Sequence, residues 1–355
     1  DINPREKHGQ AMAIWGAGIM VGPIIGPTLG GYLTETLNWR WVFYINVPLG
    51  VIALAGLAAY LPHMPRRTRR FDFIGFAALG IGVGCLQLML DRGGEVDWFN
   101  SVEIWIELAI SMCGFWVFVI WIMGVEHPFL DPHMFADRNF ATGLILIFIV
   151  GIVLLASLAL LPPMLSSLFG YPVITTGMVM APRGVGTMIM MIAAGKLLRV
   201  IDARKLVMTG LIFTSASLYI MTGFGPQMNA TPIIVSGFVQ GIGLGLVFVP
   251  LSTVAFATIA PQFRGDATAL FSLVRNIGSS IGISIVTLLL TRNTQISHTE
   301  LVSNISVFDP NFSGMMSGQW GGIMQAMTTQ YGEGAFWSVI NQIVTAQAAM
   351  VAYVD

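Results

Sequence analysis

Two arginines lie in long apolar stretches of this sequence, where a charged side chain is costly to place. Arg183 and Arg275 each stand about two to three turns inside such a stretch. Ionisable groups at membrane depth face a cavity or a partner group and mark substrate or ion pathways. Gln240 and Asn276 carry amides that can line the same cavity. These four are our candidate cavity or coupling residues. The alternative is structural, with the arginines in ion pairs or extended to the membrane surface and the amides tying helices together.

A second pattern is a stripe of glycines near the start of the chain, which we call the glycine–proline run. It consists of Gly18, Gly22, Gly26 and Gly30, with Pro23, Pro27 and Gly31 between them. Residues four apart share one helix face, so the glycines expose a continuous strip of backbone that favours close helix contact. The two prolines add local bending, because each removes a backbone donor. The alternative is a static packing seam.

The sequence does not indicate an enzyme active site. The apolar stretches contain no HExxH motif, paired carboxylates or Ser/His/Asp constellation, and no metal site is predicted. Proton coupling needs a carboxylate whose pKa is raised by burial. The acids Asp91, Glu103 and Glu107 stand near the ends of apolar stretches, so none of them is central.

The composition places the chain in a bilayer. Of its 355 residues, 55% are hydrophobic and only 10% are charged, whereas soluble domains carry roughly 25% charged residues. The mean hydropathy is +0.76. The net charge of −1 gives no field for binding nucleic acid. We therefore expect an all-α polytopic membrane protein.

Nine stretches are long and apolar enough to cross a bilayer, which takes about 20 residues each. They are 11–33, 41–61, 73–90, 104–124, 140–162, 174–198, 206–224, 232–259 and 267–290. Beyond them the sequence predicts a polar loop over 291–337. The last segment, 337–355, is amphipathic and too short in apolar residues to span.

Basic residues set the orientation. Twelve lysines and arginines fall in one set of alternate loops and three in the other, which is a positive-inside pattern. We therefore expect a multi-pass protein of the inner (plasma) membrane. The segments predicted to be cytoplasmic are 1–10, 62–72, 125–139, 199–205 and 260–266.

Two segments carry a resemblance to a known family. Gly22-Pro23-Ile24-Ile25-Gly26-Pro27-Thr28-Leu29-Gly30-Gly31 resembles the antiporter motif on the fifth helix of the major facilitator superfamily. Trp39-Arg40-Trp41-Val42-Phe43-Tyr44-Ile45-Asn46-Val47-Pro48-Leu49-Gly50 resembles the start of the sixth helix in its EmrB/QacA drug-exporter branch. The resemblance implies that the glycine–proline run is a gating seam between the two halves of a transporter.

Two further spans separate these segments from a recognisable second half. Asp91-Arg92-Gly93, followed by Asp97-Trp98-Phe99, is similar to the segment between the extra helices of the fourteen-helix branch. Against that template we expect nine of fourteen helices, without the first four and the last. We expect four parts along the chain. The end of the N-terminal bundle is 1–62, and a linker with the extra helix pair is 63–139. The C-terminal bundle is 140–290, and an external loop leading toward the last helix is 291–355.

The resemblance implies proton-coupled efflux of hydrophobic or amphipathic small molecules by alternating access. It implies no cofactor beyond the proton motive force, and it places the coupling acid on the family's first helix. The implied partners are the substrate, protons and the lipid bilayer. In a double-membraned bacterium they also include a periplasmic adaptor and an outer-membrane channel. The alternatives are a same-fold transporter of a specific metabolite and a membrane-embedded enzyme.

Overall fold

The computed structural model describes residues 18, 22, 25–26, 28–60, 71–126, 128–225, 228–303 and 333–354. All regular structure in these residues is helical. A helical segment that ends at residue 36 precedes the labelled elements. The main helices are α2 (Trp41–Tyr44), α3 (Asn46–Tyr60), α4 (Phe73–Arg92), α5 (Val102–Gly124), α6 (Arg138–Pro163), α7 (Val173–Leu197), α8 (Ala203–Met221), α9 (Thr231–Ala257), α10 (Arg264–Ser303) and α13 (Glu333–Val354).

Short polar side chains fix where several helices begin. The Asp72 carboxylate accepts from the Gly75 N–H at the start of α4, and Asp137 accepts from two backbone N–H groups of α6. Ser101 caps α5 and Asp202 caps α8 in the same way. Such caps satisfy donors that the first helical turn leaves open.

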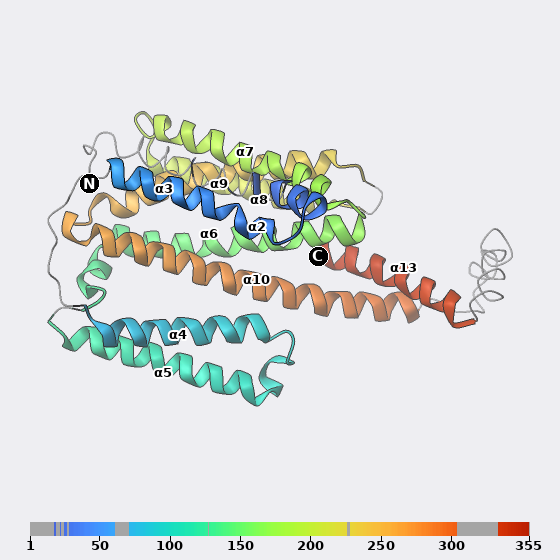
Figure 1. The fold of residues 1–355 in the computed structure, drawn as a ribbon, viewed down its shortest axis with the longest axis horizontal. Coiled ribbons are helices and arrows are strands. Elements are labelled where there is room, and N and C mark those ends of the chain that lie inside the picture. Colours follow the sequence, from blue (N-terminus) through green and yellow to red (C-terminus); the bar gives the residue numbers. More distant parts are fainter. Residues whose placement is uncertain are drawn as a thin grey trace.

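The bundle is built around α9. This helix packs extensively against α7 and α8, while α6 joins it to α10. Figure 1 shows α6–α10 running side by side, with α3 across one face of them. None of the residues of α3 is buried by the rest of the described chain. The interior of the bundle is therefore formed mainly by α6–α10.

The pair α4–α5 stands apart from this bundle, beside α10 (Figure 1). Asp72 holds its base together, because its carboxylate also accepts from the Trp121 indole N–H at 2.9 Å and from the Phe129 N–H at 2.9 Å. Burial alone would raise the pKa of this carboxyl, but these hydrogen bonds together lower the pKa of Asp72 below its ordinary value. The pair thus forms a hairpin anchored at one end by a charged group.

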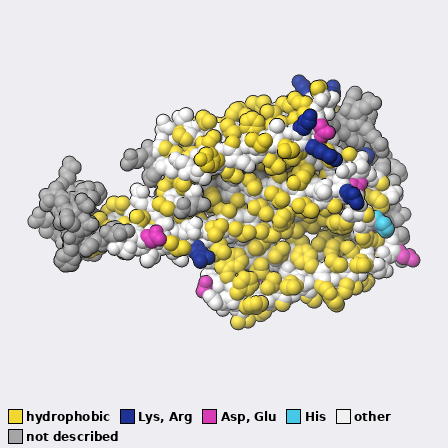
Figure 2. Space-filling model, turned by 180° about the vertical axis from the view of Figure 1, so that it is seen from behind, with side chains coloured by type: hydrophobic (Ala, Val, Ile, Leu, Met, Phe, Trp, Pro, Cys, Tyr) yellow, Lys and Arg dark blue, Asp and Glu magenta, His cyan; other side chains and the backbone are white. Residues whose placement is uncertain are grey.

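Seven helices of the described chain are long and apolar enough to cross a membrane. They correspond to the predicted spans from 41–61 to 174–198, and to 232–259 and 267–290. Figure 2 shows a flank covered by hydrophobic side chains, with most of the visible charged side chains gathered at one end. The loops predicted to be cytoplasmic join helix ends that lie together at one end of the molecule in Figure 1.

Two of the nine predicted spans are not among these seven helices. The span 206–224 is helical as α8, but its polar residues leave it outside the seven. The span 11–33 falls mostly outside the described residues.

The predicted polar loop over 291–337 is wrong in its first part. α10 continues through it to Ser303 and reaches 40 residues, about 60 Å at 1.5 Å per residue. The segment after the loop also forms a helix, α13, which packs along α10. His298 Nε2 donates to Asn341 Oδ1 at 2.9 Å between them. Low hydropathy marks where α10 leaves the apolar layer, but α13 supports its helical form beyond that point.

Candidate transport site

Glycines of α9 set the closest helix contacts of the bundle. A Cβ at Gly241 would collide with the Arg183 carbonyl oxygen, and one at Gly245 would lie 2.8 Å from the Thr187 carbonyl oxygen, both on α7. Gly243 faces α8 instead, where a Cβ would lie 2.7 Å from the Gly210 carbonyl oxygen. Residues four apart share a helix face, so this glycine run serves two neighbouring helices at once. We call this contact the α9 seam.

A second seam joins α6 to α10. A Cβ at Gly282 would lie 2.7 Å from the Ile152 carbonyl oxygen, and one at Gly278 would collide with the Phe148 carbonyl oxygen. Gly151 stands equally close to α10. The spacing of four between Gly278 and Gly282 was the sequence signal for this seam.

Arg183 and Gln240 lie inside the bundle at one level of α7 and α9. Arg183 is 6% exposed, and Gln240 is fully buried. The Gln240 amide Nε2 donates to Ser157 Oγ of α6 at 3.1 Å. Its Oε1 is buried and has no donor among the described residues. Because a buried acceptor without a donor is costly, this amide is suited to accept from a ligand or water.

Arg275 and Asn276 are not part of that interior group. The Arg275 guanidinium lies over the Phe248 ring of α9, 5.9 Å from its centroid, which is a cation–π distance. Asn276 is exposed on α10. The structure therefore brings Arg183 and Gln240 to one level and leaves Arg275 and Asn276 at the α10 surface of the bundle.

An apolar cavity of about 330 Å³ adjoins the Ser157–Gln240 pair. α6, α8, α10 and α13 line it, with Ser157 and Thr222 as polar members of a wall that is otherwise almost wholly apolar. Small-molecule sites are of this size and kind, with mostly apolar walls and a few placed polar groups. Sequence reasoning missed Ser157, because no pattern linked it to Gln240, 83 residues away.

The glycine–proline run is only partly packed. No described atom lies within 4 Å of where a Cβ would stand at Gly18, Gly22, Gly26 or Gly30. Gly31 does make a close approach, since a Cβ there would lie 3.0 Å from Val173 Cγ1 at the start of α7. Pro23 and Pro27 lie outside the described residues. The proposed gating seam stays a prediction, and Gly31 at its end lies against the start of α7.

The segment between α4 and α5 has a structural role, which its side-chain contacts explain. Arg92 forms an ion pair with Glu103 across the top of the hairpin. The Gln87 amide donates to Asp91 Oδ1 at 2.8 Å. A Cβ at Gly93 would lie 2.8 Å from the Trp98 ring, so only glycine leaves room for that ring. Asp91 and Arg92 therefore lie at the connected end of the α4–α5 hairpin, opposite the end that Asp72 holds.

The helical composition and seams agree with the comparison to known proteins. The sequence pattern of the Major Facilitator Superfamily matches residues 1–283, which is well over half of the chain. The chain belongs to this superfamily. The chain therefore has the fold of a Major Facilitator Superfamily transporter, and it is not an enzyme. Its place is the cytoplasmic membrane. These points agree with the predictions from the sequence.

Relatives specify the branch within the Major Facilitator Superfamily. The chain is 33% identical over 351 residues to the multidrug export protein EmrB of Escherichia coli, covering 98% of this chain and 67% of EmrB. It is 31% identical over 341 residues to the fatty acid resistance protein FarB of Neisseria gonorrhoeae, covering 93% and 67%. It is 28% identical over 285 residues to the lincomycin resistance protein LmrB of Listeria monocytogenes, covering 80% and 60%. The predicted EmrB-like branch is confirmed.

Proposed function

We propose that the protein exports hydrophobic or amphipathic small molecules in exchange for protons, by alternating access. The observation that carries this proposal is the apolar cavity beside the buried Ser157–Gln240 pair. Apolar walls with few polar groups suit substrates that share hydrophobicity rather than a fixed pattern of donors. EmrB is named for multidrug export, LmrB for lincomycin resistance and FarB for fatty acid resistance, and these names support export of small molecules here.

The division of the chain is part of this proposal. We assign 1–62 to the N-terminal bundle, 63–139 to the linker with α4 and α5, 140–290 to the C-terminal bundle, and 291–355 to the outer segment. The two bundles would rock about a central site, with the proton motive force as energy source and a coupling acid on the family's first helix. In a double-membraned bacterium, a periplasmic adaptor and an outer-membrane channel would complete the export path.

Transport in reconstituted vesicles tests the proposal. With the full-length protein in proteoliposomes, a proton gradient should drive movement of a fluorescent hydrophobic cation across the membrane. The proton gradient should dissipate while the cation moves. A protonophore should abolish the movement, because the gradient is the only energy source supplied. Movement that continues unchanged without the gradient would contradict proton exchange. Gradient-driven movement of one metabolite, with no movement of hydrophobic compounds, would favour the specific transporter instead.

The cavity makes a separate prediction. Ala156 lines it from α6, and Ala156→Phe should fill much of its volume and reduce transport about tenfold, since each 1.4 kcal/mol of lost binding is a factor of ten. Ile149→Phe is the control, because Ile149 is on the same helix but is 46% exposed on its outer side. Transport rates and thermal unfolding are measured for both. Equal rates for the two variants would place the substrate elsewhere.

A further inference from the structure

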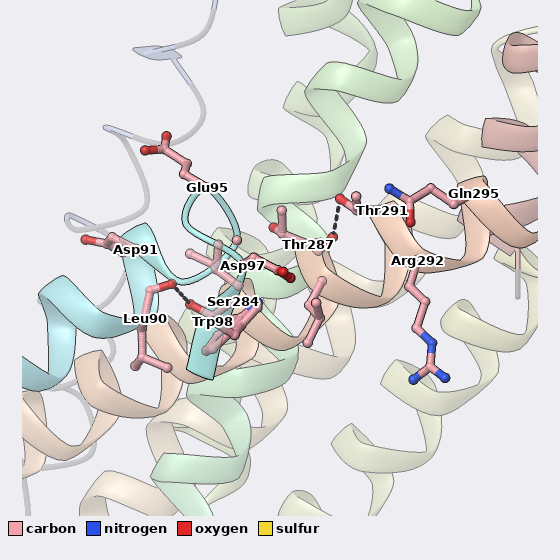
Figure 3. Close-up of a pocket in the computed structure, with 13 residues that line it drawn as sticks. Leu90, Asp91, Glu95, Asp97, Trp98, Ser284, Thr287, Thr291, Arg292 and Gln295 are labelled. Atoms are coloured by element: carbon pink, nitrogen blue, oxygen red, sulfur yellow. Dashed lines mark hydrogen bonds between the residues drawn. The ribbon is translucent and has the colours of Figure 1, made fainter. Parts of the chain in front are cut away.

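Two cavities of the described chain differ in the charges of their walls. The larger, of about 560 Å³, lies between the connected end of the α4–α5 hairpin and the second half of α10 (Figure 3). Asp91, Glu95 and Arg292 line it, but their charged groups point away from one another (Figure 3). The smaller, of about 330 Å³, is the cavity beside the Ser157–Gln240 pair, and none of the described residues that line it is charged. The polar side chains that an occupant meets there are hydroxyls.

Two hydroxyls in the wall of the smaller cavity already donate their protons to the backbone. The Ser157 hydroxyl donates to the Val153 carbonyl oxygen at 2.8 Å. The Thr222 hydroxyl donates to the Tyr219 carbonyl oxygen at 2.7 Å. A hydroxyl has one donor and two acceptor lone pairs. Both oxygens therefore keep only acceptor capacity for an occupant of the cavity.

Gln240 holds the Ser157 hydroxyl in this arrangement. Its Nε2 donates to Ser157 Oγ at 3.1 Å, so one lone pair of that oxygen is used and one is left. Turning the hydroxyl proton into the cavity would break the bond to the Val153 carbonyl oxygen. Because chains of hydrogen bonds polarise one another, donation to Val153 also makes the Ser157 oxygen a better acceptor. The Ser157 oxygen is thus fixed as an acceptor at the cavity wall.

Tyr353 of α13 supplies the third hydroxyl of the described wall, and this phenol can donate as well as accept. Its ring packs against the apolar cluster that includes Leu161, Met164 and Phe224. One phenol proton is too few for an ionised carboxylate, because both oxygens of that group need donors. A negative charge with no cation beside it is also costly to bury. The wall therefore suits hydrogen-bond donors and does not suit carboxylates.

We propose that this cavity selects substrates that carry an N–H or O–H donor on a compact apolar body, and that it discriminates against ionised carboxylates. The donor would bind the remaining lone pair of Ser157 or a lone pair of Thr222, and the body would lie against the apolar wall. The volume of about 330 Å³ is at the lower end of the range of roughly 300–1,000 Å³ for small-molecule sites, so the body is compact. The inference rests on the proposed function, because it names the substrate class of the same cavity.

Binding of matched ligands to the purified full-length protein, without a proton gradient, tests this inference. The probes share a naphthalene body that is substituted at the same ring position. Naphthol has an O–H donor, methoxynaphthalene has none, and naphthoate is an ionised carboxylate. Equilibrium dialysis against protein-free detergent gives an apparent Kd for each. We expect naphthol to bind about fivefold tighter than methoxynaphthalene, which is the effect of one hydrogen bond, and naphthoate to bind the weakest of the three.

Hydroxyl variants locate the preference. The double variant Ser157→Ala, Thr222→Val removes both acceptor oxygens and should bring the affinities for naphthol and methoxynaphthalene to within about twofold of each other. Thr222→Val alone should reduce the preference in part. Thr291→Val is the matched control. The Thr291 hydroxyl also donates to a carbonyl oxygen four residues earlier, at 3.0 Å, but it lines the larger cavity (Figure 3). This control should leave the preference intact.

Three results would overturn the inference. Equal affinity of the unmodified protein for naphthol and methoxynaphthalene would do so without any variant having to fold. Naphthoate that binds as tightly as naphthol would show that the cavity accepts anions. A preference unchanged in the double variant would place the donor contact elsewhere. The proposed function fails separately: if transport ignores the proton gradient but the preference for naphthol is found, proton exchange is rejected and the selectivity of the cavity is supported.

Discussion

Replacing Gly241 by leucine is expected to leave little folded protein. A Cβ at this position collides with the Arg183 carbonyl oxygen and would lie 2.9 Å from the Thr187 N–H nitrogen. Both obstacles are backbone atoms of α7, so no rotamer change relieves them. Separating α7 from α9 would open the most extensive contact between helices in the described part of the chain. We expect a loss of about 3 kcal/mol or more of folding free energy, measured by thermal unfolding and by the monodisperse fraction in detergent.

Gly84→Leu is the matched control for that variant. Gly84 is a helical glycine of α4 with no described atom within 4 Å of a Cβ, so the same side chain meets open space. Leucine there should preserve stability, because it also has the higher helix propensity. A loss of 1 kcal/mol lowers Tm by roughly 2–4 °C even in a large domain. A Gly241→Leu protein that unfolds at the parent temperature would contradict the α9 seam.

Helix positions followed closely from the sequence where a cap and an apolar run coincide. The predicted span 73–90 is α4, Phe73–Arg92, and it begins directly after Asp72, whose carboxylate caps it. The predicted span 104–124 is α5, Val102–Gly124, which begins after Ser101. Hydropathy and capping are local properties, so one sequence shows both.

The continuation of α10 was not predictable in the same way. Hydropathy reports depth in the membrane, and it falls after residue 290 whether or not the helix continues. The helical form to Ser303 goes with packing against α13, which begins at Glu333. The amphipathic pattern of 337–355 gives this segment a face that can pack, but it does not show which helix that face meets.

The sequence predicted residues of the candidate site, but it did not predict which of them lie close together. Arg183 and Gln240 stand out because charge and amide groups are rare in apolar stretches. Their proximity depends on the glycines at 237 and 241, which bring α9 against Arg183. Nothing in the sequence distinguishes Ser157 from the other residues of its apolar helix. The structure shows its role, because its hydroxyl accepts from the Gln240 amide. Which helix lies against which glycine face is tertiary information.

Gly26→Leu is expected to reduce transport tenfold or more while the protein still folds. In the structure a Cβ at Gly26 meets no described atom within 4 Å, so the larger side chain should cost little stability here. We expect the glycine–proline run to close against another helix in a different state of the transport cycle. A clash that costs about 1.4 kcal/mol in that state lowers its population tenfold. Proteoliposome transport and thermal unfolding are measured side by side.

Gly31→Leu separates packing from gating in this experiment. A Cβ at Gly31 would already lie 3.2 Å from the Ile174 backbone nitrogen, so this variant should lose stability as well as transport. Gly26→Leu should lose transport alone, because its clash exists only when the run closes. Normal transport by Gly26→Leu would show that the run never forms a tight contact. Loss of folding in both variants would reduce the run to a static seam, because its contacts would then be needed in every state.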